Sequence, residues 1–115
     1  MQHMVELAAP RRGEVWYADV VGGKRRPVLV LTRDPMGARL KSVICAPITS
    51  KVRGISTEVP LGESAGLVHA SVANCDNLFL LGRGHLIRRL GAVRDDEMAV
   101  VCTAVARAIG CVPRH

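Results

Sequence analysis

Aromatic side chains are scarce in this chain of 115 residues, in which Trp16, Tyr17 and Phe79 are the whole set. Proteins that bind single-stranded nucleic acid regardless of its sequence stack the bases on several aromatic rings, so this scarcity argues against that class. No apolar run approaches the ~20 residues of a membrane-spanning helix, and the N-terminus lacks the hydrophobic stretch of a signal peptide. We therefore expect a soluble, cytoplasmic protein without a membrane segment.

Metal and nucleotide-binding motifs are also missing. The four histidines are isolated, and no spacing of His, Cys or carboxylate residues matches a zinc or magnesium site. A Walker loop and a GxGxxG turn are absent too, so we expect neither a metal nor a cofactor. Cys45 and Cys75 lie in apolar strand-like runs and Cys102 lies on an apolar helix face, which predicts buried, reduced thiols.

Positive charge is abundant, because 16 Lys and Arg residues against 10 acidic residues give a net charge of +6, and 13 of the 16 are arginine. Arginine binds phosphate through two parallel hydrogen bonds, so this composition favours an anionic partner such as nucleic acid. A chain of this length fits one domain with a modest core, which often leaves an apolar face uncovered. We therefore expect a homodimer, with the last helix and the first strand as candidate interfaces.

Short strands with glycine-rich turns precede a single helix. Gly22-Gly23 supplies a tight hairpin turn, and apolar residues from Met98 to Ile109 recur at helical spacing before Gly110. This order predicts a mainly β fold, a small and strongly curved antiparallel sheet or barrel with a C-terminal helix packed against it. The expected strands cover residues 14–20, 24–33, 42–49, 56–59, 70–75 and 86–93, and the expected organisation is a flexible arm at 1–11 before one domain at 12–112.

Two of these strands bring a positive charge opposite a hydroxyl group. If Arg33 pairs with Ser42, Arg26 lies opposite Thr49, because the numbers of paired residues in an antiparallel ladder have a constant sum. A guanidinium and a hydroxyl at one strand end can together hold a phosphate. Side chains alternate along a strand, so Arg25 is not expected to enter the same groove as Arg26.

Four motifs stand in a fixed order along the chain: RGEVWYAD at 12–19, RPVLV at 26–30, APITS at 46–50 and SVANCDN at 71–77. In order and spacing they resemble the MazF/PemK family of toxin endoribonucleases, over about residues 11–110. The resemblance implies a CcdB/PemK-type barrel, which is Src-homology-3-like. It also implies a homodimeric toxin that cuts single-stranded RNA at selected sequences without a metal, and an antitoxin that inhibits it through an acidic, partly disordered segment.

The resemblance further implies roles for individual residues. Arg26 matches the arginine implicated in cleavage, and Thr49 matches a hydroxyl that binds the scissile phosphate. Asp76 corresponds to the acid that takes the 2′-hydroxyl proton in the PemK/Kid branch, although the basic residue that precedes it there is replaced by Asn74 here. The implied reaction leaves a 2′,3′-cyclic phosphate and a 5′-hydroxyl. The other expected RNA contacts are Lys24, Arg25, Ser50, Arg53, Asn74 and Asn77.

Other interpretations stay open at this point. Arg26 also fits a surface arginine beside a strand, Thr49 an ordinary strand threonine, and Asp76 a hydrogen-bond acceptor in a turn. A CcdB-like poison of DNA gyrase shares the fold, but those relatives depend on a C-terminal tryptophan that residues 110–115 lack. A degenerate relative that binds RNA or antitoxin without cutting is a third alternative.

Overall fold

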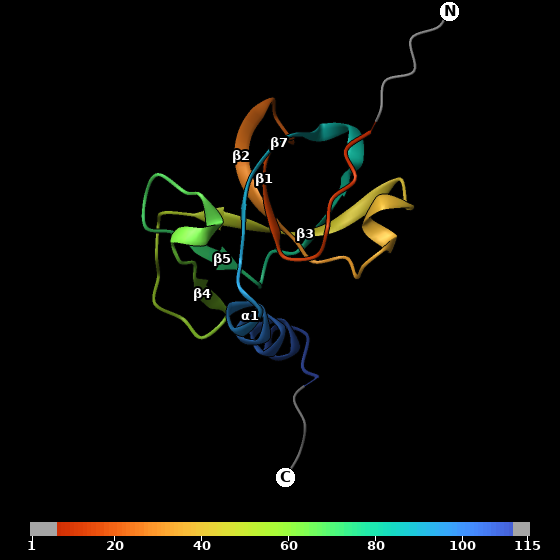
Figure 1. The fold of residues 1–115 in the computed structure, drawn as a ribbon. Helices are drawn as coiled ribbons and strands as arrows, with labels where there is room; N and C mark the ends of the chain where they lie inside the picture. The colour runs from red at the N-terminus through yellow and green to blue at the C-terminus, as the bar shows by residue number, and fades with distance from the viewer. Residues whose placement is uncertain (1–6, 112–115) are drawn as a thin grey trace, which may run out of the picture.

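The computed structural model describes residues 7–111, which form a curved antiparallel sheet with one α-helix beside it (Figure 1). None of the helices in this part of the chain is long and apolar enough to cross a membrane. The strands are β1 (Glu14–Val20), β2 (Lys24–Val30), β3 (Ser42–Thr49), β4 (Glu58–Pro60), β5 (Val72–Asn74), β6 (Phe79–Gly82) and β7 (Leu86–Ala92). The helices are α1 (Asp95–Ala108) and three short 3-10 helices, η1 (Met36–Ala38), η2 (Glu63–Ala65) and η3 (Arg83–His85).

The strands follow the order β4-β5-β3-β2-β1-β7, and β6 pairs with β3 outside this path. The predicted curved sheet with a C-terminal helix is confirmed, and the sheet stays open rather than closing into a complete barrel. The β2–β3 ladder joins Val28 to Pro47, Leu29 to Ala46 and Val30 to Cys45. This is the register predicted from the sequence, and its continuation places Arg26 opposite Thr49.

The strand limits agree with the sequence in part. β1 and β3 have the predicted bounds, whereas β2 ends at Val30 instead of residue 33. There the Thr32 hydroxyl accepts the hydrogen bond from the Ile44 N–H at 2.7 Å, which takes the place of a ladder carbonyl. β6 was missed, because its four residues carry no periodic signal and its pairing with β3 is a long-range contact.

The sheet has a buried core on each face. Leu29 packs into one core together with Met98 and Val101 of α1, whereas Val28 and Val30 on the opposite face of β2 belong to the other core. β3 was predicted to be apolar on both faces, and its buried residues contribute to both cores. Ile44 is the exception: it is 47% exposed on the outer surface.

The described end of the predicted arm is packed against the domain. The carbonyl of Ala8 accepts a 2.6 Å hydrogen bond from the Arg83 guanidinium, and Pro10 is fully buried beside Gly37. Residues 1–6 and 112–115 lie outside the described part of the chain, so the flexible arm stays a prediction for residues 1–6.

The cysteines divide into two pairs. Cys45 and Cys75 are buried as predicted, and burial raises the pKa of Cys45 to about 12 and, with the nearby Asp76 charge, that of Cys75 to about 11. Cys102 was predicted to be buried and is exposed, because the buried face of α1 runs through Met98, Val101 and Ala104 instead. Cys111 is exposed too.

A thiol-specific reagent should therefore modify the folded, reduced protein at Cys102 and Cys111. Cys45 and Cys75 should react only after unfolding, because buried thiols are protonated at neutral pH and the reagent cannot reach them. Peptide mass mapping after modification at pH 7.5, with and without guanidinium, measures this difference. Modification of Cys45 in the folded protein would contradict the described core.

Candidate functional site

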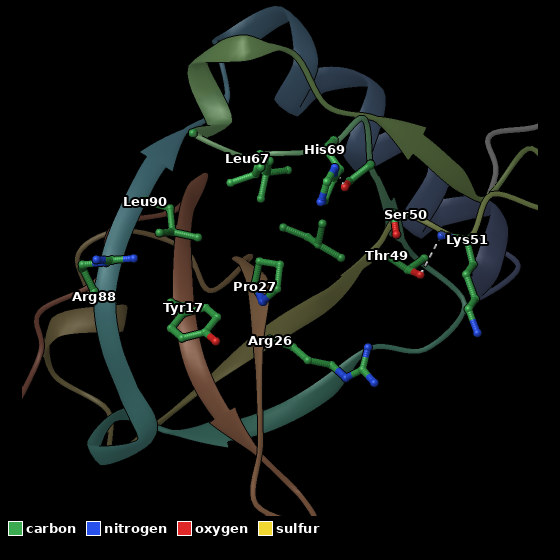
Figure 2. A pocket seen from close by; sticks show the side chains of 14 residues that line it. Tyr17, Arg26, Pro27, Thr49, Ser50, Lys51, Leu67, His69, Arg88 and Leu90 are labelled. Atoms are coloured by element: carbon green, nitrogen blue, oxygen red, sulfur yellow. Dashed lines mark hydrogen bonds between the residues drawn. The ribbon is translucent and has the colours of Figure 1, made fainter.

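A cleft of about 670 Å³ opens where β2 and β3 separate (Figure 2). The Leu31 N–H donates a hydrogen bond to the Ile44 carbonyl. Hydrogen-bonded positions recur every second residue in an antiparallel ladder, so the last such position pairs Pro27 with Ile48. Pro27 has no N–H to donate, so the ladder weakens there. The cleft is lined by Tyr17, Arg26, Pro27, Ile48, Thr49, Ser50, Lys51, Gly66, Leu67, Val68, His69, Ser71, Arg88 and Leu90.

The cleft is strongly positive. Arg26, Lys51 and Arg88 reach it from three strands or strand ends, and His69 adds an imidazole. Figure 2 shows His69, Thr49 and Ser50 along one side, with Arg88 across the cleft from them. Within the described residues no Asp or Glu lines it, so its three fixed charges are available to an anionic ligand.

Arg26 and Arg25 behave as alternation along β2 predicts. Arg26 is an exposed side chain that lines the cleft, and no carboxylate of the described residues lies within ion-pair distance of it. Arg25 lies outside the cleft, where its Nε is 3.2 Å from Oδ1 of Asp19. Only Arg26 of this pair is therefore free to bind an anion in the cleft.

Thr49 presents its hydroxyl at the end of β3. The Thr49 Oγ1 accepts a 3.0 Å hydrogen bond from the Lys51 N–H, drawn as a dashed line in Figure 2. A hydroxyl that accepts through a lone pair keeps its own hydrogen to donate. Thr49, together with the neighbouring Ser50, can therefore donate to an anion held by Arg26.

Asp76 is not in the cleft. β5 begins beside the site, where Val72 pairs with Thr49, and Asp76 follows the opposite end of this strand. Its carboxylate accepts a hydrogen bond from the Thr57 hydroxyl, and its N–H donates to the Asn74 side chain at 3.0 Å. The base role expected for Asp76 thus gains no support from its position.

The other expected RNA contacts also differ in position. Ser50 lines the cleft, whereas Arg53 lies 3.4 Å from the buried Glu58 and Asn74 is 7% exposed. Burial alone would raise the pKa of Glu58, but hydrogen bonds from the backbone of Arg53 and Gly54 and from the Arg53 side chain hold it below its ordinary value. The expected contacts that do not line the cleft are Lys24, Arg25, Arg53, Asn74 and Asn77.

Five polar cleft residues were not predicted as site residues from the sequence: Tyr17, Lys51, His69, Ser71 and Arg88. Alternation along β7 puts Arg88 and Leu90 on one face, but only the pairing of β7 with β1, which joins Tyr17 to Arg88, turns that face toward the site. His69 lies in a loop without a periodic pattern. Among the described residues no three His, Cys, Asp or Glu side chains gather into a metal-binding group.

The loop that carries His69 is anchored at its start. Its start packs backbone to backbone on β7, since a Cβ at Gly66 would lie 2.0 Å from the Leu90 carbonyl oxygen. Glu97 of α1 secures the preceding turn by accepting hydrogen bonds from the Gly62 N–H at 2.7 Å and the Ser64 hydroxyl at 3.3 Å. The backbone N–H of Arg94 is the main cause that holds the pKa of Glu97 below its ordinary value.

Replacing Glu97 with Gln should lower the free energy of unfolding at pH 7 by about 1 kcal/mol, because charged acceptors form the stronger hydrogen bonds. Since the folded-state pKa of Glu97 is lowered, this stabilisation is complete above the unfolded value near ~4.3 and is lost as the pH falls through the folded value. Urea titrations at pH 7 and pH 3.5 measure the change. The exposed Glu63→Gln is the control, and a difference that persisted at pH 3.5 would contradict the assignment.

Comparison with known proteins agrees with this architecture. The family described as PemK-like, MazF-like toxin of type II toxin-antitoxin system matches residues 11–109. The chain is 37% identical over 105 residues to a Mycobacterium tuberculosis protein named probable endoribonuclease MazF5. This alignment covers 90% of this chain and 96% of that relative.

Two solved structures extend the comparison to the fold. One is the M. tuberculosis toxin MazF-mt6, with a TM-score of 0.80 and 34% identity, covering 87% of this chain and 99% of the other. The second is a mycobacterial endoribonuclease in complex with its cognate antitoxin, with a TM-score of 0.83 and 32% identity, covering 92% and 100%. The resemblance found in the sequence motifs is confirmed, and this chain belongs to the PemK/MazF family of type II toxin-antitoxin toxins.

Proposed function

We propose that this protein is an endoribonuclease toxin that cuts single-stranded RNA at selected sequences, with the positive cleft as its active site. The observation that carries the proposal is that Arg26, free of any described carboxylate, lines the same cleft as the Thr49 hydroxyl, just beyond the open end of the β2–β3 ladder. The relatives named as endoribonucleases, at 37% and 39% identity, support the same activity.

In the proposed reaction the 2′-hydroxyl of the RNA attacks the neighbouring phosphorus and the 5′ oxygen leaves. Negative charge then grows on the non-bridging phosphate oxygens. Arg26 stabilises this charge through its guanidinium fork, and Thr49 donates a hydrogen bond to the same phosphate. The products are a 2′,3′-cyclic phosphate and a 5′-hydroxyl.

Lys51 and Arg88 suit the flanking phosphates of the bound strand, because they lie on opposite sides of the cleft (Figure 2). Three fixed cations supply the charge neutralisation that a metal ion provides in other nucleases, and the proposed reaction is therefore metal-independent. RNA selection follows from the shape of the cleft and the loop at 66–71.

The proposed protein partner is an antitoxin that lays an acidic, partly disordered segment over the cleft and mimics the charge of RNA. Its support is the unneutralised charge of Arg26, Lys51 and Arg88, together with the solved relative bound to its cognate antitoxin. The homodimer remains part of the proposal. Two exposed apolar residues favour it: Val100 on α1 and Ile109 directly after α1.

The test is incubation of a long RNA of mixed sequence with the purified protein in EDTA, followed by mapping of the product ends. Cuts at a short recurring sequence, with cyclic-phosphate and 5′-hydroxyl ends, are the expected result. A folded protein that arrests growth but cuts no RNA would overturn the proposal and indicate a binding toxin with a protein target.

A further inference from the structure

The proposed reaction needs a group that accepts the proton of the 2′-hydroxyl. The guanidinium of Arg26 and the ammonium of Lys51 are hydrogen-bond donors without an acceptor atom, and Asp76 lies outside the cleft. A tyrosine hydroxyl such as that of Tyr17 ordinarily keeps its proton up to pH ~10. Imidazole is the one side chain in this lining whose ordinary pKa, ~6.5, suits a base near neutrality, and His69 supplies it.

His69 is well positioned for this work. It is an exposed residue in the loop between η2 and β5, and its carbonyl accepts a 2.9 Å hydrogen bond from the Ser71 hydroxyl. One residue after Ser71, Val72 pairs with Thr49, so the loop is fixed to the strand end that carries the phosphate-binding hydroxyl. Figure 2 shows the imidazole on the Thr49 side of the cleft, directed into it.

The other titratable groups that line the cleft with His69 come from four strands or their ends. They are Tyr17 from β1, Arg26 from β2, Lys51 after β3 and Arg88 from β7, and none of them is a carboxylate. These cations draw the RNA phosphate into the space in front of the imidazole. An imidazole in this position has no described carboxylate beside it in the lining.

We infer that His69 is the general base of the cleavage reaction, an inference that rests on the proposed endoribonuclease function. The proton of the 2′-hydroxyl passes to the free ring nitrogen of neutral His69 while the O2′–P bond forms and the P–O5′ bond breaks. The leaving 5′ oxygen takes a proton from solvent. The imidazolium then returns its proton to water, so the protein is regenerated.

The test compares the pH dependence of single-turnover cleavage in wild type and His69→Gln on one RNA that the wild type cuts. For wild type the rate should rise tenfold per pH unit on the acidic side and level off at higher pH, as a general base loses its proton. For the variant the rate should fall about 10²- to 10⁴-fold and lose this inflection. Affinity for the same RNA with a 2′-deoxy sugar at the scissile position should change less than about 3-fold.

Two control variants sharpen the result. His85→Gln removes an exposed histidine in η3 that does not line the cleft, and Asp76→Asn removes the carboxylate predicted from the family resemblance. Both should keep the wild-type inflection. Added imidazole should restore part of the activity of His69→Gly, which no purely structural role predicts.

Each remaining outcome overturns a distinct claim. Wild-type protein that fails to cut RNA rejects the proposed function itself. If the wild type cuts RNA, two results for His69→Gln would reject the base role alone. One is a pH profile that keeps the wild-type inflection, and the other is an equal loss of RNA affinity and cleavage rate. Loss of the inflection in Asp76→Asn with retention in His69→Gln assigns the base to Asp76 instead.

Discussion

Replacing Arg26 with Ala should lower kcat/KM for RNA cleavage by about 10²- to 10³-fold, the usual cost of removing one donor aimed at a developing oxyanion. The reason is that Arg26 lines the cleft without a described carboxylate partner, so its whole charge is available to the phosphate. Arg26→Lys should recover only part of the loss, because an ammonium lacks the planar two-donor fork. Steady-state cleavage of a short fluorescent RNA measures these values.

Arg25→Ala is the matched comparison for Arg26. It removes an identical side chain one residue away, on the opposite side of β2 and paired with Asp19. We expect a loss below about 5-fold, in the range of an exposed contact to the RNA backbone. Equal losses in the two variants would mean that the arginines act as diffuse charge, and the catalytic role of Arg26 would be rejected.

Replacing Gly91 with Ala should destabilise the fold by about 3 kcal/mol or more, because the added methyl group would meet main-chain atoms that cannot rotate away. A Cβ at Gly91 would lie 2.3 Å from the Ser64 carbonyl oxygen and 2.6 Å from the Ala65 carbonyl carbon. β7 and η2 would have to separate, and the loop that carries His69 would move with η2. Urea unfolding measures the stability, and RNA cleavage below the unfolding transition measures the effect on the cleft.

Gly84→Ala is the control for this substitution. Its Cβ would meet only the Leu7 side chain, at 3.6 Å, which is an ordinary van der Waals contact. We expect a change within about 0.5 kcal/mol. Equal stability of Gly91→Ala and Gly84→Ala would show that the close packing of η2 on β7 is not required for folding.

The β2–β3 half of the site could be predicted from the sequence, because its information is local. Two apolar runs joined by a short turn region allow few registers, and the constant sum then places Arg26 opposite Thr49. The observed ladder from Val28–Pro47 to Val30–Cys45 has that register. The positions expected for β1 and β3 were confirmed for the same reason.

The opposite half could not be predicted, because it depends on contacts between distant segments. Arg88 faces the cleft only because β7 pairs with β1. The position of the loop that carries His69 depends on the packing of Gly66 against Leu90. Helical periodicity predicted that Cys102 lies on the buried face of α1. The sheet covers only a narrower part of the apolar face of the helix, so Cys102 is exposed. Partners that lie this far apart leave no periodic trace in one sequence.

Pro27 has a consequence for how substrate enters. Another residue at this position would place an N–H donor beside the Ile48 carbonyl. The two strands could then form one more hydrogen bond in the absence of RNA. A proline offers no such bond, so the free protein has one hydrogen bond fewer between β2 and β3 where the cleft begins. The covalent structure of one side chain therefore keeps the β2–β3 ladder one hydrogen bond shorter at the edge of the cleft before any RNA is bound.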